Sequence, residues 1–351
     1  MTMPSEMMAI AISRLGGPEV LEPVRLPVPR PGPGEVLIRV AAAGINAPDL
    51  GQRRGVYDPP PGASPLPGLE VSGEIVALGT GVSGLASGDA VVALANGGGY
   101  AEYVAVPAGQ VLPLPRGWSL VAGAALPETF FTVQQTLVMR AGLAPGMNVL
   151  IHGAAGGIGG AAIQISRRYG AQPIAVVSDA QKARYAEALG ASAVINHTSE
   201  DFVARTLELT GGRGADRILD IVGGDTLPRN IEAAARGGHI VQVAALAGKL
   251  SEISAGKIVL KWLTISGSTL RPQSPEAKAA IAKSLRQEVW PALEDGRIVR
   301  PRIRAFPLEE AAAGHVAMER RENYGKIILL TGYGRSLVNA GPIPDNSIEI
   351  T

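Results

Sequence analysis

The sequence predicts an α/β protein in two parts, a β-rich first part and a doubly wound parallel-sheet second part. Three observations carry this prediction. About the first 130 residues have the pattern of short strands and turns, the chain from about Pro127 alternates strands with helices, and a cluster of glycines follows the first of those strands. The length of 351 residues also favours two domains over one hydrophobic core.

The first part shows the alternation of half-buried strands. In 31-PGPGEVLIRVAAAGIN-46 a Pro-Gly turn precedes apolar residues at every second position, which are Val36, Ile38 and Val40. Further short strands are predicted in 71-VSGEIVALG-79, 89-DAVVAL-94 and 100-YAEYVAV-106, separated by Gly, Pro, Asp and Ser. Many short strands with regular turns favour a compact, barrel-like β domain.

The second part has the pattern of a parallel sheet with helices on both faces. After a helix over 128–143, strands are predicted at 147–153, 173–177, 193–195, 217–222, 239–244 and 258–267. The helices between them are predicted at 158–169, 181–190, 199–210 and 227–236. This order indicates the doubly wound architecture.

The C-terminal region is predicted to return to the first domain. A helix over 275–294 has Ser274 as its N-cap and Pro275 at its first position, and residues 300–330 have the pattern strand, helix, strand. Beyond Gly332 the chain is polar without a period, so we expect a loose tail. The predicted domains are 8–129 with 274–332, then 130–273, with 333–351 as the tail.

Composition excludes several classes of function. The 32 Lys and Arg residues nearly balance the 31 Asp and Glu residues, for a net charge of +1, which argues against an electrostatic footprint for nucleic acid or anionic lipid. No apolar run approaches the roughly 18 residues that span a bilayer. The start MTMPSEMMAI lacks the pattern of a signal peptide, so we expect a soluble cytoplasmic protein.

The sequence also argues against a metal site. It has no cysteine, so thiolate nucleophiles and thiolate metal ligands are excluded. Its four histidines, His152, His197, His239 and His315, include no pair at i,i+4 spacing. The chemistry is therefore expected to be metal-free, and His152, on a strand, is expected to be a core residue.

The stretch 147-MNVLIHGAAGGIGGAAIQISRRYGA-171 predicts a dinucleotide site. Its glycines lie between a predicted strand and a predicted helix, where a pyrophosphate binds the helix N-terminus. They fit the dinucleotide fingerprint in two registers, one with Ala154, Gly156 and Gly159, the other with Gly157, Gly159 and Ala162. No Lys-Ser or Lys-Thr follows them, so a P-loop is excluded.

The end of the second strand, where the adenosine ribose is recognised, leaves the cofactor open. Asp179 lies 20 residues beyond Gly159, where an acid accepts the 2′-hydroxyl of NAD. Ser178 and Lys182 flank it, and Lys182 could neutralise the 2′-phosphate of NADP. Spacing alone does not decide between NAD and NADP.

These motifs resemble the medium-chain dehydrogenase/reductase superfamily. The β domain, the strand-G-A-A-G-G-I-G-helix turn and the closing Y-G-K-I-I-L carry the resemblance, and the absence of cysteine points to the zinc-independent branch. Residues 46–79 are similar to the NADPH:quinone oxidoreductases of that branch, as are 126-LPETFFTVQQTL-137, 195-INHTSEDF-202 and 219-LDIVGG-224. The resemblance covers about residues 8–331.

The resemblance implies a GroES-like β domain and a Rossmann domain, with the active site in the cleft between them. It also implies a homodimer or homotetramer joined along the Rossmann sheet, here through strand 258–267. At the nicotinamide end it implies Asn46 and Tyr57 as catalytic residues, with Thr132 near the carboxamide. It further assigns to the dinucleotide the positions Gly156, Gly157, Ile158 and Gly159 at the pyrophosphate, then Val222, Ala244, Ala245, Leu246, Ser268, Thr269, Leu270 and Lys326.

Two departures from the family pattern concern the 2′-phosphate of NADP. The family has Gly-Ser followed by Lys, whereas this chain has Ser178-Asp179 before Lys182, which places an acid beside the phosphate. The family often has Tyr after I-N, and here His197 stands there. Lys182 and His197 favour NADPH, and Asp179 opposes it. We expect NADPH, with NADH as the alternative.

The function predicted from these features is metal-free hydride transfer from NADPH to quinones or related electron-poor acceptors. An enone or enoyl-thioester reductase is the first alternative, with Tyr57 as proton donor, and a non-enzymatic dinucleotide-binding redox sensor is the second. Tyr57 could also be an exposed loop residue, and Asn46 could only shape a turn. Asp49 is expected to cap or pair structurally.

Overall fold

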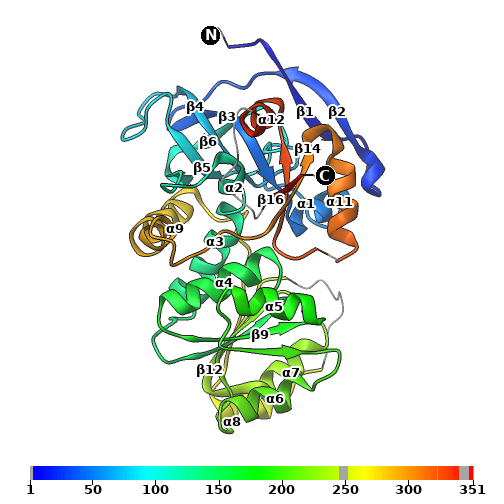
Figure 1. The fold of residues 1–351 in the computed structure, drawn as a ribbon, viewed down its shortest axis with the longest axis vertical. Coiled ribbons are helices and arrows are strands. Elements are labelled where there is room, and N and C mark those ends of the chain that lie inside the picture. The colour runs from blue at the N-terminus through cyan, green and yellow to red at the C-terminus, as the bar shows by residue number, and fades with distance from the viewer. Residues whose placement is uncertain (1–2, 245–251, 322, 340–347, 351) are drawn as a thin grey trace. The chain divides into compact units, whose positions relative to one another are not determined.

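The structure is a computed structural model that describes residues 3–244, 252–321, 323–339 and 348–350. The chain divides into two compact units (Figure 1). Unit 1 consists of Met1–Phe131, Arg271–Glu294 and Arg300–Thr351, and unit 2 consists of Thr132–Leu270 and Asp295–Val299. The α/β fold class predicted from the sequence is confirmed.

Unit 1 is built on a mixed sheet to which both ends of the chain contribute. Its order is β16-β14-β15-β3-β4-β5-β7, with β6 also paired to β3, and β1 and β2 form a separate antiparallel pair. The strands are β1 (Glu6–Ile12), β2 (Leu21–Pro27), β3 (Glu35–Gly44), β4 (Glu70–Leu78), β5 (Ala90–Leu94), β6 (Tyr103–Pro107), β7 (Val111–Pro113), β14 (Ile303–Pro307), β15 (Lys326–Leu330) and β16 (Ile348–Ile350).

The helices of unit 1 cover this sheet and its edges. They are α1 (Ala47–Arg53), α2 (Leu120–Gly123), α9 (Pro275–Glu288), α10 (Trp290–Glu294), α11 (Ala311–Glu319) and α12 (Gly332–Asn339). Helix α3 (Pro127–Val133) begins in unit 1, and the π-helical segment that follows it, Gln134–Arg140, belongs to unit 2. The predicted cap of α9 is confirmed, because the Ser274 side chain accepts a hydrogen bond from the Ala277 amide.

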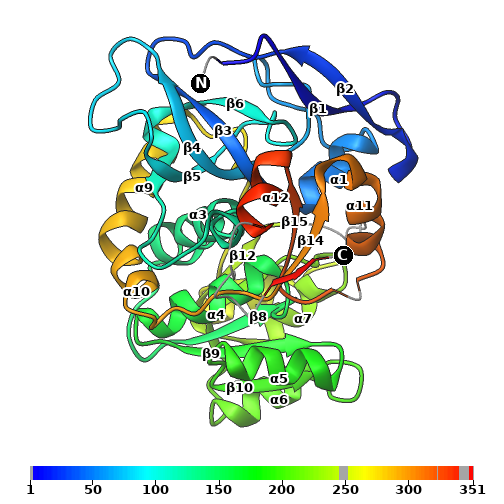
Figure 2. The ribbon, with the colours of Figure 1, turned by 45° about the horizontal axis from the view of Figure 1, so that its top comes forward.

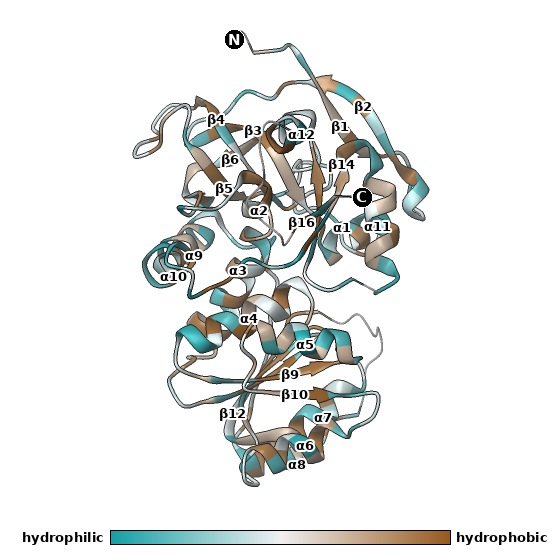
Figure 3. Ribbon diagram, viewed as in Figure 1, coloured by the Kyte–Doolittle hydropathy of each residue, from teal (hydrophilic) through white to brown (hydrophobic). Residues whose placement is uncertain are grey.

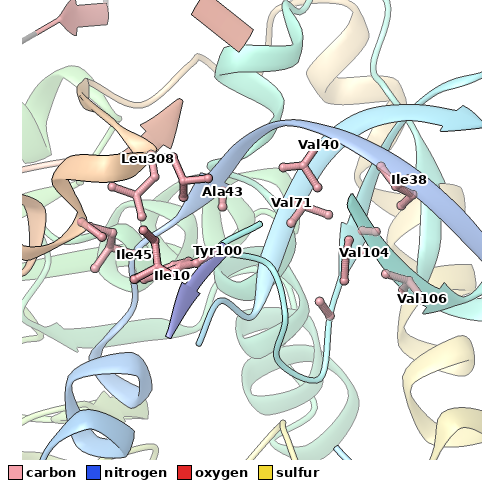
Figure 4. Close-up of a cluster of buried hydrophobic side chains, with 14 of the residues drawn as sticks. Ile10, Ile38, Val40, Ala43, Ile45, Val71, Tyr100, Val104, Val106 and Leu308 are labelled. Carbon is pink, nitrogen blue, oxygen red and sulfur yellow. The ribbon is translucent and has the colours of Figure 1, made fainter. Parts of the chain in front are cut away.

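The core of unit 1 lies where β3 meets its neighbours. Val36, Ile38 and Val40 are fully buried, as their alternation predicts, and Ile38 and Val40 pack near Val71 and Val104 (Figure 4). Leu37, at an intervening position, is also fully buried. Strand β3 is therefore covered on both faces, which the alternation alone did not predict.

Unit 2 is a doubly wound parallel sheet, as predicted. Its order is β10-β9-β8-β11-β12-β13 and every pairing is parallel. The strands are β8 (Asn148–His152), β9 (Gln172–Val177), β10 (Ala193–Asn196), β11 (Ala215–Asp220), β12 (Ala234–Gln242) and β13 (Thr264–Gly267), with helices α4 (Gly157–Arg168), α5 (Ala180–Ala188), α6 (Phe202–Leu209), α7 (Thr226–Ala233) and α8 (Ala255–Lys261). Strands β9 and β10 are strongly hydrophobic (Figure 3). The strand order reverses beside β8, where ligands bind in such sheets.

The prediction of one strand over 258–267 is wrong in its first half. Residues up to Lys261 belong to α8, whose Ser254 cap accepts a hydrogen bond from the Lys257 amide. Trp262 then adopts a left-handed conformation, with φ of 54°, and ends the helix before β13 begins at Thr264. A short apolar run fits a strand or a helix equally well, and here the cap decides for the helix.

The expectation of a loose tail beyond Gly332 is also wrong for the residues described there. Helix α12 packs against β3, and β16 pairs with β14 (Figure 2). The Tyr333 hydroxyl lies 3.1 Å from a carboxylate oxygen of Glu74, and the Arg39 guanidinium lies 4.0 Å from the Tyr333 ring centroid. Tertiary contacts of this kind order a segment that has no apolar period of its own.

We predict that Gly334→Ala destabilises the chain and that Gly332→Ala does not. A Cβ atom at Gly334 would overlap the Ala41 carbonyl oxygen of β3, whereas one at Gly332 would meet no atom within 4 Å. Overpacking of this kind costs about 1–3 kcal/mol, more than the helix propensity gained by alanine. Urea unfolding followed by circular dichroism measures both free energies of unfolding. Equal stabilities for the two variants would contradict the packing of α12 on β3.

Candidate functional site

The turn between β8 and α4 leaves an uncapped helix N-terminus. Gly153 adopts φ of 63° directly after the strand, and Gly156 precedes the helix with φ of −80°. No side chain caps the 12-residue helix α4 at this end. Its first amide N–H groups have no carbonyl partner one turn earlier, and the helix dipole adds partial positive charge, so this end of the helix suits an anion.

The glycines of this turn have distinct structural roles. A Cβ atom at Gly159 would overlap the Gly153 carbonyl oxygen and the Ala154 Cα atom, so Gly159 allows close packing of the helix on the turn. A Cβ atom at Gly156 would meet only the Gly153 oxygen, at 3.4 Å. In the dinucleotide fingerprint the third position allows close packing of the helix, and the second leaves open space for the pyrophosphate. Gly159 and Gly156 have these two roles, which matches the register of Ala154, Gly156 and Gly159. Positive φ at Gly153 makes the tight turn in place of Ala154.

Ser178, Asp179 and Lys182 form a connected corner after β9. The Asp179 side chain caps α5, where it accepts a hydrogen bond of 2.9 Å from the Lys182 amide. The Lys182 Nζ atom lies 3.2 Å from Asp179 Oδ2 and donates to Ser178 Oγ at 2.9 Å. The Lys182 amide, and to a lesser degree the Ser178 hydroxyl and the Lys182 side chain, lower the pKa of Asp179. The acid that opposes NADPH is thus engaged by its own helix and paired with Lys182.

His197 lies at the same corner. Its amide donates to the Val177 carbonyl oxygen at 3.0 Å, and its side chain is exposed. The neighbouring Thr198 hydroxyl donates to the Ser178 carbonyl oxygen at 3.2 Å. The structure therefore brings together three of the residues predicted for the 2′-phosphate, namely Ser178, Lys182 and His197.

Asp220 organises the end of β11 and was not identified from the sequence. This fully buried carboxylate accepts hydrogen bonds from the Val222 amide at 2.7 Å, the Thr226 hydroxyl at 2.6 Å and the Asn230 side chain at 2.8 Å. In the sequence, this role was indicated by an acidic residue at the end of the predicted strand, within the segment LDIVGG. Asp220 shapes the turn that carries Val222, one of the predicted dinucleotide residues.

His152 is a core residue, as predicted. Its Nε2 atom lies 2.7 Å from Asn230 Oδ1, and its ring meets Phe202 edge to face. Burial lowers its pKa, which favours the neutral imidazole.

The remaining predicted dinucleotide residues of unit 2 follow other strand ends. Ala244 follows β12, and Ser268, whose amide donates to the Gln242 carbonyl at 2.9 Å, follows β13 with Thr269 and Leu270. Thr132 lies in α3, and its carbonyl accepts a hydrogen bond of 2.6 Å from the Thr136 hydroxyl. Ala245 and Leu246 lie outside the described residues.

Unit 1 contains a buried polar cluster centred on Glu70 and Lys326. Their side chains form an ion pair and are exposed by 0% and 4%. Asn46 bridges them, because its Nδ2 donates to Glu70 Oε1 at 2.8 Å and its Oδ1 accepts from Lys326 Nζ at 2.8 Å. The structure thus joins two residues that the sequence placed near the cofactor, Asn46 and Lys326, through an acid that the sequence analysis missed.

Asp49 has the structural role expected of it. Its carboxylate accepts hydrogen bonds from the Asn46 amide at 2.8 Å and the Gly68 amide at 2.9 Å. The Tyr100 hydroxyl lies 3.3 Å from Asp49 and 3.1 Å from His315 Nε2. Burial raises the pKa of Asp49 to about 6, against the opposing effect of the two amides.

Glu128 is, after Asp220 and Glu70, the third acid that the sequence analysis missed. Its amide donates to Glu70 Oε2 at 2.9 Å, and the residue is only 7% exposed. No hydrogen bond to its carboxyl group is formed by any residue that the structure describes. Burial, and then the charges of Glu70 and Asp49, raise the pKa of Glu128 to about 8. A buried acid of this kind is a functional-site candidate.

Tyr57 is half-buried in the loop after α1. The Arg271 guanidinium carbon lies 5.9 Å from its ring centroid. Burial, and then the charge of Glu128, raise the pKa of Tyr57, whereas Arg271 lowers it. Within the described parts of the chain no hydrogen bond is formed by its hydroxyl, so Tyr57 is connected to Glu128 by charge rather than by contact.

The described residues include neither a cluster suited to a metal ion nor a helix suited to a membrane. No group of three or more His, Cys, Asp or Glu residues in them is arranged to hold a metal ion. No helix among them is long and apolar enough to cross a membrane.

A hollow of about 480 Å³, lined by Arg167, Gln172, Glu187 and their neighbours, lies at the amino ends of β9 and β10. Ligands of doubly wound sheets bind at the opposite, carboxyl edge.

Two family models match the chain. The alcohol dehydrogenase GroES-like domain matches residues 32–116, and the zinc-binding dehydrogenase model matches residues 157–285. The pig (Sus scrofa) quinone oxidoreductase is 32% identical, over 92% of this chain and 98% of its own length.

Solved structures agree in fold over most of the chain. An Escherichia coli quinone oxidoreductase solved with NADPH has a TM-score of 0.80 and 30% identity, over 92% of this chain and 99% of its own. A structure described as an NAD-dependent alcohol dehydrogenase has a TM-score of 0.82 and 35% identity, over 93% of this chain and 100% of its own.

The chain belongs to the medium-chain dehydrogenase/reductase superfamily, in its quinone oxidoreductase branch. It is an NAD(P)H-dependent oxidoreductase with a GroES-like domain and a Rossmann domain.

Proposed function

We propose that this protein is an NADPH:quinone reductase that transfers a hydride to quinones or related electron-poor acceptors. The choice of a quinone as the acceptor is supported by the similarity to a quinone oxidoreductase across 92% of the chain, which spans both units. The proposal assigns no role to a metal ion.

The residues of unit 2 fit a dinucleotide. The uncapped N-terminus of α4, at Gly156 to Gly159, is suited to hold a pyrophosphate by its amide groups. Lys182, Ser178 and His197 offer a cation, a hydroxyl and an imidazole at one corner, the donors that a 2′-phosphate requires. Because Asp179 already accepts the Lys182 amide and pairs with its ammonium group, its charge is partly offset at this corner.

When bound, a reduced nicotinamide supplies a hydride to an electron-poor acceptor. Unit 1 supplies groups that handle the accompanying proton. The Tyr57 phenol is a donor whose hydroxyl has no hydrogen-bond acceptor among the described residues, and Asn46 is fixed by Glu70 and Lys326. Quinones need little protonation by the protein, because the charge on the reduced ring is delocalised and water can protonate it.

Reduction of enones or enoyl thioesters is the second candidate function. The half-buried Tyr57 favours it, because an enone carbonyl gains from a positioned phenol during hydride addition. The two candidates therefore differ in how strongly they depend on Tyr57.

We predict that the protein oxidises NADPH with 1,2-naphthoquinone and that Tyr57→Phe leaves this rate within about threefold. With 2-hexenal or crotonyl-CoA, Tyr57→Phe should lower kcat by about 100-fold if the phenol donates the proton. Absorbance of the nicotinamide band measures each rate, and Tyr103→Phe, at another half-buried tyrosine of unit 1, is the control. Tight NADPH binding without oxidation by any acceptor would contradict the proposal and favour a redox sensor.

We predict that Lys182→Ala weakens NADPH binding about tenfold or more and changes NADH binding less than about twofold. Loss of one charge-assisted contact to the 2′-phosphate accounts for this difference, since 1.4 kcal/mol is a factor of ten. Titration calorimetry measures both Kd values. Lys257→Ala, which removes another ion-paired lysine of unit 2, should change neither. Equal losses for both cofactors would contradict a 2′-phosphate site.

We further propose a homodimer formed through β13 and α8 of unit 2. Strand β13 has β12 as its only neighbour in the described sheet, so its outer edge offers unpaired backbone groups. Beside it, Val259, Leu260 and Trp262 are exposed by 70%, 74% and 66%. A two-fold axis lets a second copy pair with the same edge and cover the same apolar patch.

Leu260→Glu is expected to convert the dimer to a monomer, because it would bury a charge in the apolar patch. Size-exclusion chromatography with light scattering measures the mass. Leu15→Glu, at a comparably exposed leucine of unit 1, should leave the dimer intact. A monomeric wild-type chain, or an unchanged mass for Leu260→Glu, would contradict this interface.

A further inference from the structure

The loop that carries Tyr57 depends on its surroundings for its shape. It runs over residues 54–69, from the end of α1 to the start of β4, and five of its residues are proline. Proline has no amide hydrogen to donate, so such a loop forms few hydrogen bonds of its own. Near its far end the loop is joined to a neighbouring segment, because the Gly98 amide donates to the Leu66 carbonyl oxygen at 2.9 Å.

Gln52 and Arg271 connect the two ends of this loop. Gln52, in α1, donates from Nε2 to the Pro65 carbonyl oxygen at 2.7 Å, and its Oε1 accepts from Arg271 Nη1 at 2.8 Å. The other terminal nitrogen of Arg271, Nη2, donates to the Asn96 carbonyl oxygen at 3.2 Å. The Arg271 guanidinium is therefore bonded both to the helix that precedes the loop and to the segment that borders its far end.

The same guanidinium lies close to the Tyr57 ring. Its Cζ atom is 5.9 Å from the ring centroid, within the roughly 6 Å reach of a cation–π contact. Arg271 is only 4% exposed, and it forms no ion pair with any residue that the structure describes. Because a cation–π contact is stronger when the cation is removed from water, this arrangement favours a fixed position of the ring.

Lys278, in α9, holds Arg271 in place. It is 1% exposed, and its Nζ donates to the Arg271 carbonyl oxygen at 2.7 Å and to Asn96 Oδ1 at 2.6 Å. One lysine thus binds both residues of the bond between Arg271 and Asn96. The guanidinium is fixed by these contacts in advance of any acceptor, as a supporting residue of a functional group must be.

We propose that Arg271 is a positioning residue for acceptor reduction, which holds the loop through Gln52 and Asn96 and holds the phenol of Tyr57 through its ring. This inference rests on the proposed function. During hydride addition the acceptor oxygen takes the proton of the Tyr57 phenol, and water returns a proton to the phenolate. Arg271 exchanges no proton in this step, and it acts only through the place that it gives to Tyr57.

Hydrogen exchange tests the hold on the loop without turnover. Arg271→Met removes the cation and both of its side-chain hydrogen bonds. Exchange at the amides of Gly68 and Gly98, which join the loop to its neighbours, should rise about tenfold or more, while exchange in β3 stays that of the wild type. Unchanged exchange at both amides would overturn the role of Arg271. An equal rise in β3 would show a general loss of stability and would overturn it as well.

A double-mutant cycle tests whether Arg271 acts through Tyr57. With NADPH and 2-hexenal, Arg271→Met should lower kcat about tenfold or more in the wild-type chain, because a misplaced reacting group costs rate on this scale. In the Tyr57→Phe background it should change kcat less than about twofold, because the proton that it positions is gone. Fully additive losses would show an effect independent of Tyr57 and would overturn the proposed role.

Two further variants complete the test. Arg271→Lys keeps the charge but lacks the planar fork that bonds Gln52 and Asn96 together, so it should recover only part of the rate. It also takes both measurements if Arg271→Met does not fold, and wild-type exchange together with wild-type kcat in this variant would overturn the proposed hold. Arg286→Met, at an exposed arginine of α9, is the matched control and should equal the wild type.

The outcomes separate this inference from the proposed function. A wild type that oxidises NADPH with 1,2-naphthoquinone but not with 2-hexenal would overturn the role of Arg271 in proton donation and leave the proposed function standing. A wild type that reduces 2-hexenal, together with an Arg271→Met variant of unchanged kcat, would also overturn only the role of Arg271. A wild type inactive with every acceptor would overturn the proposed function and this role together.

Discussion

The buried ion pair between Glu70 and Lys326 is the interaction on which unit 1 most depends. It joins the first residue of β4 to the first residue of β15, two strands that lie far apart in the sequence and flank β3. Loss of one partner would leave the other charge buried and unpaired, which costs about 3–5 kcal/mol. The same pair fixes Asn46 at both ends of its amide and places a negative charge beside Glu128. A Cβ atom at Gly44 would overlap the Glu70 carboxylate, so a glycine at the end of β3 is part of the same arrangement.

Unit 2 depends on a simpler constraint. All six of its parallel strands end at the same edge of the sheet, and each is followed there by residues of the predicted dinucleotide site or, after β10, by His197. Asp220 and the cap at Asp179 show how local hydrogen bonds shape these turns without a ligand. Chemistry at this edge therefore follows from topology, and the individual residues modify affinity and cofactor choice.

Sequence reasoning succeeded where a pattern is local. The period of the strands and helices, the cap at Ser274 and the glycine turn each lie within a few residues, and each was predicted. It failed where the outcome depends on distant partners. Helix α12 is ordered by Ala41, Glu74 and other residues of the sheet, which no reading of the tail reveals. Glu128 stands in a segment used to identify the family, but its chemistry depends on Glu70 and Asp49, 58 and 79 positions earlier.

The two acids that bear most on function, Asp179 and Glu128, illustrate why an acidic residue alone predicts little. Asp179 is exposed to water, accepts an amide of its own helix and lies 3.2 Å from an ammonium group, so it is held ionised and its charge is offset nearby. Glu128 is buried beside two other acids, and the cations that act on it are bound to neutral acceptors or to Glu70. The first acid therefore loses much of its power to repel a phosphate, and the second, whose pKa is raised to about 8, retains its proton at neutral pH. Both consequences follow from the partner that each carboxyl group has, rather than from the residue type.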